Sequence, residues 1–109
     1  MNYQDIIQGI ATRLSSINPY KAIIFGSYAY GEPSLDSDID IIVVLNKKGF
    51  PADYNEMMEN HRTVRKLLRD INRETALDII VYTIDEWESF IKTGSYFSRV
   101  VLEKGKAIA

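Results

Sequence analysis

The chain has 109 residues, which is enough for one domain and too few for two. Its composition is ordinary for a globular protein, and no apolar run approaches the roughly 20 residues of a membrane-spanning helix. The net charge of -2 argues against a protein that mainly coats nucleic acid. The absence of cysteine excludes disulfides and thiolate metal sites, and without a signal peptide or membrane span a cytoplasmic location is expected.

The first third of the chain predicts a helix, a strand and a turn. Tyr3 to Ser16 carries apolar residues at helical spacing, and Lys21 to Phe25 is a short, β-branched run typical of a buried strand. Gly26 and Ser27 end this strand. The stretch from Tyr28 to Asp36 is expected to form a short helical turn followed by a loop.

The middle of the chain contains the clearest patterns. Asp38 to Leu45 is the strongest strand signal in the sequence, and Asp53 to about Arg73 follows the helical period. On this helix, His61 shares the apolar stripe and is interpreted as a partly buried structural histidine. Leu77 to Tyr82 is the third expected strand.

The C-terminal part predicts two short helices and an edge strand. Asp85 is a candidate N-cap for the first helix, Tyr96 to Leu102 forms the second, and Lys106 to Ile108 follows as the strand. The expected fold class is α/β (α+β), a small mixed β-sheet with helices packed mainly on one face. Residues 1–109 are expected to form a single domain.

Three aspartates interrupt the apolar strands. Asp38 and Asp40 are two residues apart, so their side chains share one face of a strand, about 7 Å apart along the chain. Asp78 stands within another apolar run and could join them from a neighbouring strand. Because like charges in apolar surroundings are costly, a divalent cation such as Mg²⁺ is the expected compensation. Asp36, in contrast, is interpreted as a turn residue.

A candidate phosphate-binding turn precedes the acidic pair. Gly26 allows the backbone to approach a phosphate closely, and Ser27 adds a hydroxyl donor. A helical turn starting near Ser27 would direct free backbone N–H groups at an anion. Such turns are common, so the value of this one comes from its position before Asp38.

These motifs together resemble the signature of the DNA polymerase β-like nucleotidyltransferase superfamily. Phe25-Gly26-Ser27, ten residues and then Asp38-Ile39-Asp40-Ile41 match its Gly-Ser and acidic pair, and Leu77-Asp78-Ile79 matches its third acidic position. The resemblance implies a palm-like fold that uses a nucleoside triphosphate and two Mg²⁺ ions. It implies Gly26 and Ser27 as triphosphate-binding residues and the three aspartates as catalytic metal ligands, with Asp78 helping to activate the acceptor.

The short length and the spacing most resemble the minimal nucleotidyltransferases encoded beside helical HEPN proteins. That branch implies an antitoxin that transfers AMP from ATP to a tyrosine of its HEPN toxin partner. Larger relatives hold the base and the acceptor with a second, mostly helical domain. We therefore expect a partner chain or a homodimer to complete the site here.

Two other functions stay open at this stage. The enzyme could act on a small molecule or an RNA end, or the chain could be a non-catalytic nucleotide-binding module that neutralises a partner by covering it. The basic residues Arg62, Lys66, Arg69 and Arg73 are interpreted as a solvated face, with a binding face for phosphate, RNA or an acidic partner as the alternative. Lys47 and Lys48 are candidates to reach a phosphate.

Overall fold

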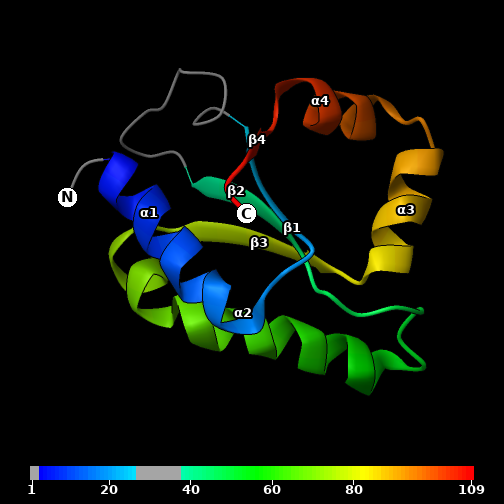
Figure 1. The fold of residues 1–109 in the computed structure, drawn as a ribbon, viewed down its shortest axis with the longest axis horizontal. Helices are drawn as coiled ribbons and strands as arrows, with labels where there is room; N and C mark the ends of the chain where they lie inside the picture. The colour runs from blue at the N-terminus through cyan, green and yellow to red at the C-terminus, as the bar shows by residue number, and fades with distance from the viewer. Residues whose placement is uncertain (1–2, 27–37) are drawn as a thin grey trace.

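The computed structural model describes residues 3–26 and 38–109 (Figure 1). The strands of its sheet are β1 (Lys21–Phe25), β2 (Ile39–Val44), β3 (Leu77–Tyr82) and β4 (Lys106–Ala107). The helices are α1 (Tyr3–Leu14), the 3-10 turn η1 (Ser15–Ile17), α2 (Tyr54–Glu74), α3 (Ile84–Lys92) and α4 (Tyr96–Lys104). None of the described helices combines the length and apolar character needed to cross a membrane.

The sheet is mixed, as the sequence predicts. Its strand order is β3-β2-β1-β4, in which β1 pairs antiparallel with β2 and β4, and β2 pairs parallel with β3. The apolar run of β2 accounts for its central place, because nearly every residue of that strand is buried. Strand β3 is an edge strand, and most of its residues are only partly buried.

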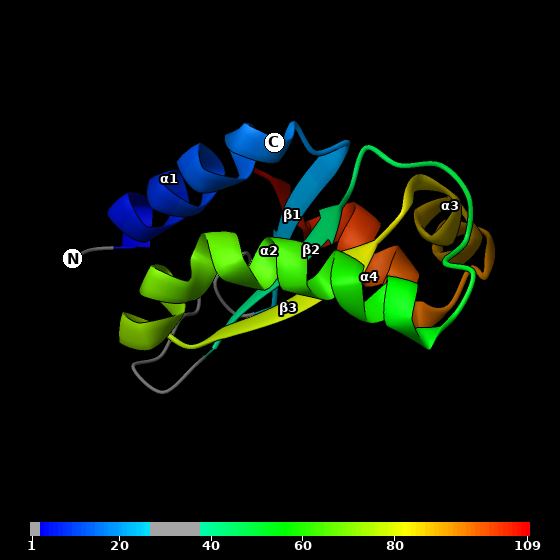
Figure 2. The same cartoon turned by 90° about the horizontal axis from the view of Figure 1, so that it is seen from below.

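Helices pack on both faces of the sheet, in two pairs, and not mainly on one face as the sequence predicts, because the two C-terminal helices also bury apolar side chains. Helices α1 and α2 lie side by side over one face, where Leu14, Ile41, Val64 and Leu68 are fully buried (Figure 2). Helices α3 and α4 pack over the other face, where a smaller cluster includes Trp87. The odd-numbered residues of β2 and β3 face the first pair of helices, and the even-numbered residues face the second.

The start of α3 corrects one sequence expectation. Thr83, and not Asp85, is the N-cap: its side chain accepts from the Glu86 N–H, and the Glu86 side chain accepts from the Thr83 N–H. This reciprocal capping box satisfies two backbone donors, which a single cap at Asp85 could not do. Asp85 lies in the first turn instead, and its carboxylate accepts a hydrogen bond from the Gly49 N–H.

Candidate active site

Strand register brings two of the three aspartates together. Asp40 is paired with Phe25 of β1 on one side and with Asp78 of β3 on the other. Side chains directly opposite each other on neighbouring strands point to the same face, so these residues form one row across the sheet. The row lies on the α3/α4 face, because Ile42 and Ile80 follow on that face in the next row.

The electrostatics of Asp40 show that the other two carboxyl groups act on it. Burial raises the pKa of Asp40, and the negative charges of Asp78 and then Asp38 raise it further, as does a hydrogen bond with Asp78. Asp38 lies just before β2 and is exposed, as is Asp78. The structure therefore gathers like charges around a half-buried carboxyl group, an arrangement that lowers stability unless a cation joins it.

Gly26 makes room for this group. Its φ of +79° lies in the left-handed region that glycine tolerates. A Cβ atom at this position would overlap Oδ2 of Asp40 and stand 3.2 Å from its Cγ. Sequence reasoning assigned Gly26 to phosphate approach alone, whereas the structure adds a second requirement, space for the Asp40 carboxylate.

The other half of the candidate phosphate turn lies outside the described residues. This applies to Ser27 and to the whole stretch from Tyr28 to Asp36. The role of Ser27 therefore stays a prediction.

The donor set fits a divalent cation. Within residues 3–26 and 38–109, no three acidic or histidine side chains are already arranged to hold a metal ion. What the structure does show is that two exposed carboxyl groups, those of Asp78 and Asp38, crowd the partly buried carboxyl group of Asp40. Carboxylate oxygens are the ligands that Mg²⁺ prefers, and a bound cation would remove the repulsion.

An aromatic row beside the aspartates was not predicted from sequence. The Phe25 ring contacts Phe97 of α4 at 5.4 Å between centroids, and Phe97 contacts Phe90 of α3 at 5.5 Å. Phe97 is 41% exposed. The alternation of β1 could have placed Phe25 on the aspartate face, but only the folded chain brings α4 onto it.

The basic candidates lie elsewhere. Lys47 follows the far end of β2, where its ammonium group donates to Asn60 Oδ1 at 3.1 Å and pairs with Glu56 at 3.3 Å. It is therefore not placed to reach a phosphate beside the aspartates. Lys48 is exposed. The four basic residues on the outer side of α2 are exposed as well, namely Arg62, Lys66, Arg69 and Arg73.

Two contacts of this helix refine the expected solvated face. Arg62 pairs with Glu59 on the same helix, whereas Asp70 pairs with Arg13 of α1. His61 is partly buried, as predicted, and burial, followed by the charge of Arg65, lowers its pKa.

Comparison with known proteins identifies solved structures that share this fold. A toxin–antitoxin complex crystallised with AMP-PNP shares 21% identity and a TM-score of 0.54, covering 94% of this chain and 72% of its own. A mutant MntA–HpeT toxin–antitoxin complex, with two aspartates changed to glutamate, shares 18% identity and a TM-score of 0.50, covering 100% and 73%. Among curated proteins, none matches the sequence.

At these identities, the two solved structures show a shared fold and no more. The family model of the nucleotidyltransferase domain matches residues 7–108. This range is nearly the whole chain and includes Asp38, Asp40 and Asp78. The chain belongs to the nucleotidyltransferase domain family, and it is a nucleotidyltransferase.

Proposed function

We propose that this enzyme transfers AMP from ATP to a tyrosine hydroxyl of a partner protein, as the Mg²⁺-dependent antitoxin of a toxin–antitoxin pair. The observation that carries the proposal is the row in which Asp40 and Asp78 lie side by side, with Gly26 directly next to Asp40. Asp38 adds the third carboxylate. Carboxylates on neighbouring strands are what two-metal nucleotidyl transfer requires.

The chemistry is a displacement at phosphorus. The acceptor oxygen forms a bond to the α-phosphorus of ATP, the bond from that phosphorus to the bridging oxygen breaks, and pyrophosphate leaves. The proton of the acceptor hydroxyl is lost, and we propose Asp78 as the group that receives it; its exposure and its outer position on β3 support this role. Attacking and leaving oxygens must lie roughly in line, at opposite ends of the reacting phosphate.

Gly26 and the three aspartates each have a task in this mechanism. Gly26 keeps the backbone close to the triphosphate and leaves space for Asp40. Asp38, Asp40 and Asp78 would together hold the Mg²⁺ ions. When bound, Mg²⁺ would neutralise charge on the triphosphate and orient the leaving pyrophosphate.

The partner is proposed from the two fold relatives. Both were solved as toxin–antitoxin complexes, and one contains AMP-PNP, an analogue of ATP. This supports an adenine nucleotide as donor and a toxin as the protein that receives AMP. With the sequence resemblance, it favours a helical HEPN-type toxin over a small molecule or an RNA end.

A transfer assay with labelled ATP, Mg²⁺ and the protein encoded beside this chain tests the proposal. Wild-type enzyme should label the partner on tyrosine, and the double variant Asp38→Asn/Asp40→Asn should not. Equal labelling by both proteins would overturn the mechanism. Labelling of tRNA or aminoglycosides by the isolated enzyme would replace the protein acceptor, and full neutralisation of the toxin by the inactive variant would indicate a binding module.

A further inference from the structure

The outer edge of β3 is an unpaired strand edge. The Ile39 N–H donates to the Ala76 carbonyl and the Leu45 N–H to the Tyr82 carbonyl, so the even-numbered residues of β3 direct their backbone groups at β2. Ile79 and Val81 must therefore direct theirs outward. No described residue bonds to these two, whereas the outward N–H of Leu77 is taken up by Asn72 Oδ1 at 2.9 Å.

This edge passes directly beside the candidate active site. Figure 2 shows β3 along the margin of the sheet, next to α2. Asp78 is exposed on this strand, in register with Asp40 on β2. Its neighbours Ile79 and Ile80 are only partly buried, whereas Ile41 and Ile42 on β2 are fully buried. A long apolar edge with free backbone groups is a template for another strand.

We propose that the acceptor protein docks by adding an extended segment to the outer edge of β3, with its tyrosine opposite Asp78. The inference rests on the proposed function and goes beyond it, because it assigns how the acceptor is recognised. Backbone bonds to Ile79 and Val81 would supply affinity, and alternate side chains would supply specificity.

The order of the row explains why the acceptor would arrive from this side. Gly26, the proposed triphosphate contact, lies at the end of β1, Asp40 stands in the middle on β2, and Asp78 is outermost on β3. An attacking oxygen on the β3 side would therefore stand across the α-phosphorus from the leaving pyrophosphate, if the pyrophosphate lies toward Gly26. A tyrosine opposite Asp78 can reach across one strand spacing of about 4.8 Å, whereas a serine oxygen stays beside its own Cβ.

Charge on α2 complements such a segment. Arg65 lies seven residues before Asn72, about two helical turns, so both are on the side of α2 that faces β3. Arg65 and Arg69 are exposed, and no salt bridge found among the described residues involves either. A residue opposite Ile79 or Val81 points to the α2 face, so the acceptor segment should carry an acidic residue one or three positions from its tyrosine.

A second copy of this chain fits the edge poorly. Antiparallel pairing of two β3 strands through their outward groups would place each Asp78 opposite Ile80 or Tyr82 of the copy. That pairing would cover a carboxylate with apolar side chains, at a cost that no described cation offsets.

Amide hydrogen exchange with synthetic peptides tests the docking without any chemistry. The probes are extended tyrosine peptides with glutamate at odd or at even spacings, added with Mg²⁺ and a non-hydrolysable ATP analogue. Odd-spaced peptides should protect the amides of Ile79 and Val81. N-methylation of a single peptide amide should abolish protection only when that amide faces β3. Because the backbone groups of a strand alternate between its two edges, this is the case at every second residue of the peptide.

Charge reversal supplies a matched test of the acidic position. Arg65→Glu/Arg69→Glu should lower protection by the odd-spaced acidic peptides about tenfold, the scale of two exposed ion pairs. Lys66→Glu, about 100° round the helix from Arg65, should leave it unchanged. Equal loss in both proteins would contradict the charge assignment.

The outcomes separate this inference from the proposed function. Transfer to peptides that leave Ile79 and Val81 unprotected would overturn the docking and keep the enzyme. Protection without transfer to any peptide or partner would keep the docking and overturn the acceptor chemistry. Protection that depends on enzyme concentration, in the absence of peptide, would identify a second copy as the occupant and overturn the proposal.

Discussion

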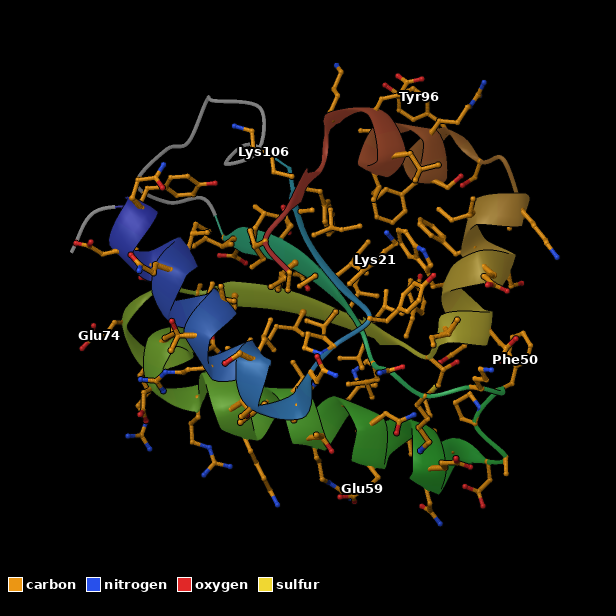
Figure 3. All side chains as sticks on the ribbon, viewed as in Figure 1. Lys21, Phe50, Glu59, Glu74, Tyr96 and Lys106 are labelled. Carbon is orange, nitrogen blue, oxygen red and sulfur yellow. The ribbon has the colours of Figure 1, made fainter. Side chains whose placement is uncertain are left out.

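The two ends of the central sheet carry acidic side chains in opposite circumstances. At the end where β2 begins, Asp40 is surrounded by other carboxyl groups, and its pKa is raised. At the end where β2 finishes, Glu56 accepts a hydrogen bond from the Ala52 backbone and pairs with Lys47, and its pKa is lowered. In Figure 3, Glu74 at the end of α2 marks the side of the first end, and Phe50 on the loop before α2 marks the side of the second.

The difference separates groups that stabilise the fold from groups that serve chemistry. At the end where β2 finishes, hydrogen bonds hold the loop before α2 in place. Lys47 donates to Asn60, the Gly49 N–H donates to Asp85, and the Ile84 N–H donates to the Lys47 carbonyl. The aspartate end leaves its charges unbalanced. Perturbed, unbalanced charges are typical of functional sites, where stability is lost in exchange for a ligand.

The largest difference between the ends should come from adding a methyl group to a glycine. Gly26 and Gly49 both have positive φ, +79° and +87°, so alanine at either should cost about 1–2 kcal/mol of stability. Only at Gly26 does the new Cβ meet Asp40; at Gly49 nothing lies within 4 Å. Gly26→Ala should therefore lose about 100-fold in nucleotide transfer, as expected for a displaced catalytic group, and Gly49→Ala should keep it. Equal transfer rates would show that the Asp40 position is unimportant.

A smaller effect, confined to stability, is expected at Lys47. Asn60 is 6% exposed, and its Nδ2 already lacks a partner. Lys47→Met would leave Oδ1 of Asn60 without a partner as well. The free energy of unfolding, measured by urea denaturation, should therefore fall by about 1–3 kcal/mol. Lys48→Met, at an exposed neighbour, should change it by less than about 0.5 kcal/mol. Loss of transfer in Lys47→Met without loss of stability would move Lys47 into the active site.

The smallest effect should be a pH dependence of opposite sign at the two ends. Because the pKa of Asp40 is raised above its ordinary value of 3.8, the protonated carboxyl group stabilises the fold at pH below 3.8. This contribution is lost as the pH rises through the pKa of the folded state. Without metal, Asp40→Asn should therefore unfold at a higher temperature than wild type at neutral pH. The gain in the free energy of unfolding should be at most about 1 kcal/mol, because solvent screens the partly buried group. A metal-free variant less stable than wild type at neutral pH would contradict the charge crowding.

Glu56→Gln is the matched control for that experiment. The pKa of Glu56 is lowered, so its stabilisation is present above the ordinary 4.5 and is lost as pH falls through the folded pKa. The variant should be less stable than wild type at neutral pH, and the difference should shrink in acid. Thermal unfolding across this range, with a metal chelator present, measures both variants.

The sequence predicted the strands and a neighbouring strand that brings Asp78 to the acidic pair, but it did not predict the register. Lys21–Phe25 and Leu77–Tyr82 have the predicted bounds, because compact β-branched runs between turn residues define strands locally. The contact of Asp40 with Asp78 and the space left by Gly26 depend on register between distant segments, which no local pattern fixes.

Two further differences show where local signals were misread or absent. The capping box was present in the sequence as Thr83-x-x-Glu86, but the first turn offered Asp85 as a competing cap. Asn60 lies on the helical stripe that faces the core, yet its partner Lys47 is 13 residues away on a loop. Sequence periodicity locates a buried position but does not identify the polar group that satisfies it.

Crystals soaked with Mn²⁺ and a non-hydrolysable ATP analogue test most directly whether the crowded carboxylates exist to bind metal. Anomalous scattering should place Mn²⁺ in contact with Asp40, with Asp38 and Asp78 as its other carboxylate ligands and the triphosphate beside Gly26. Manganese bound elsewhere, or an analogue held with all three aspartates turned away from it, would contradict the account.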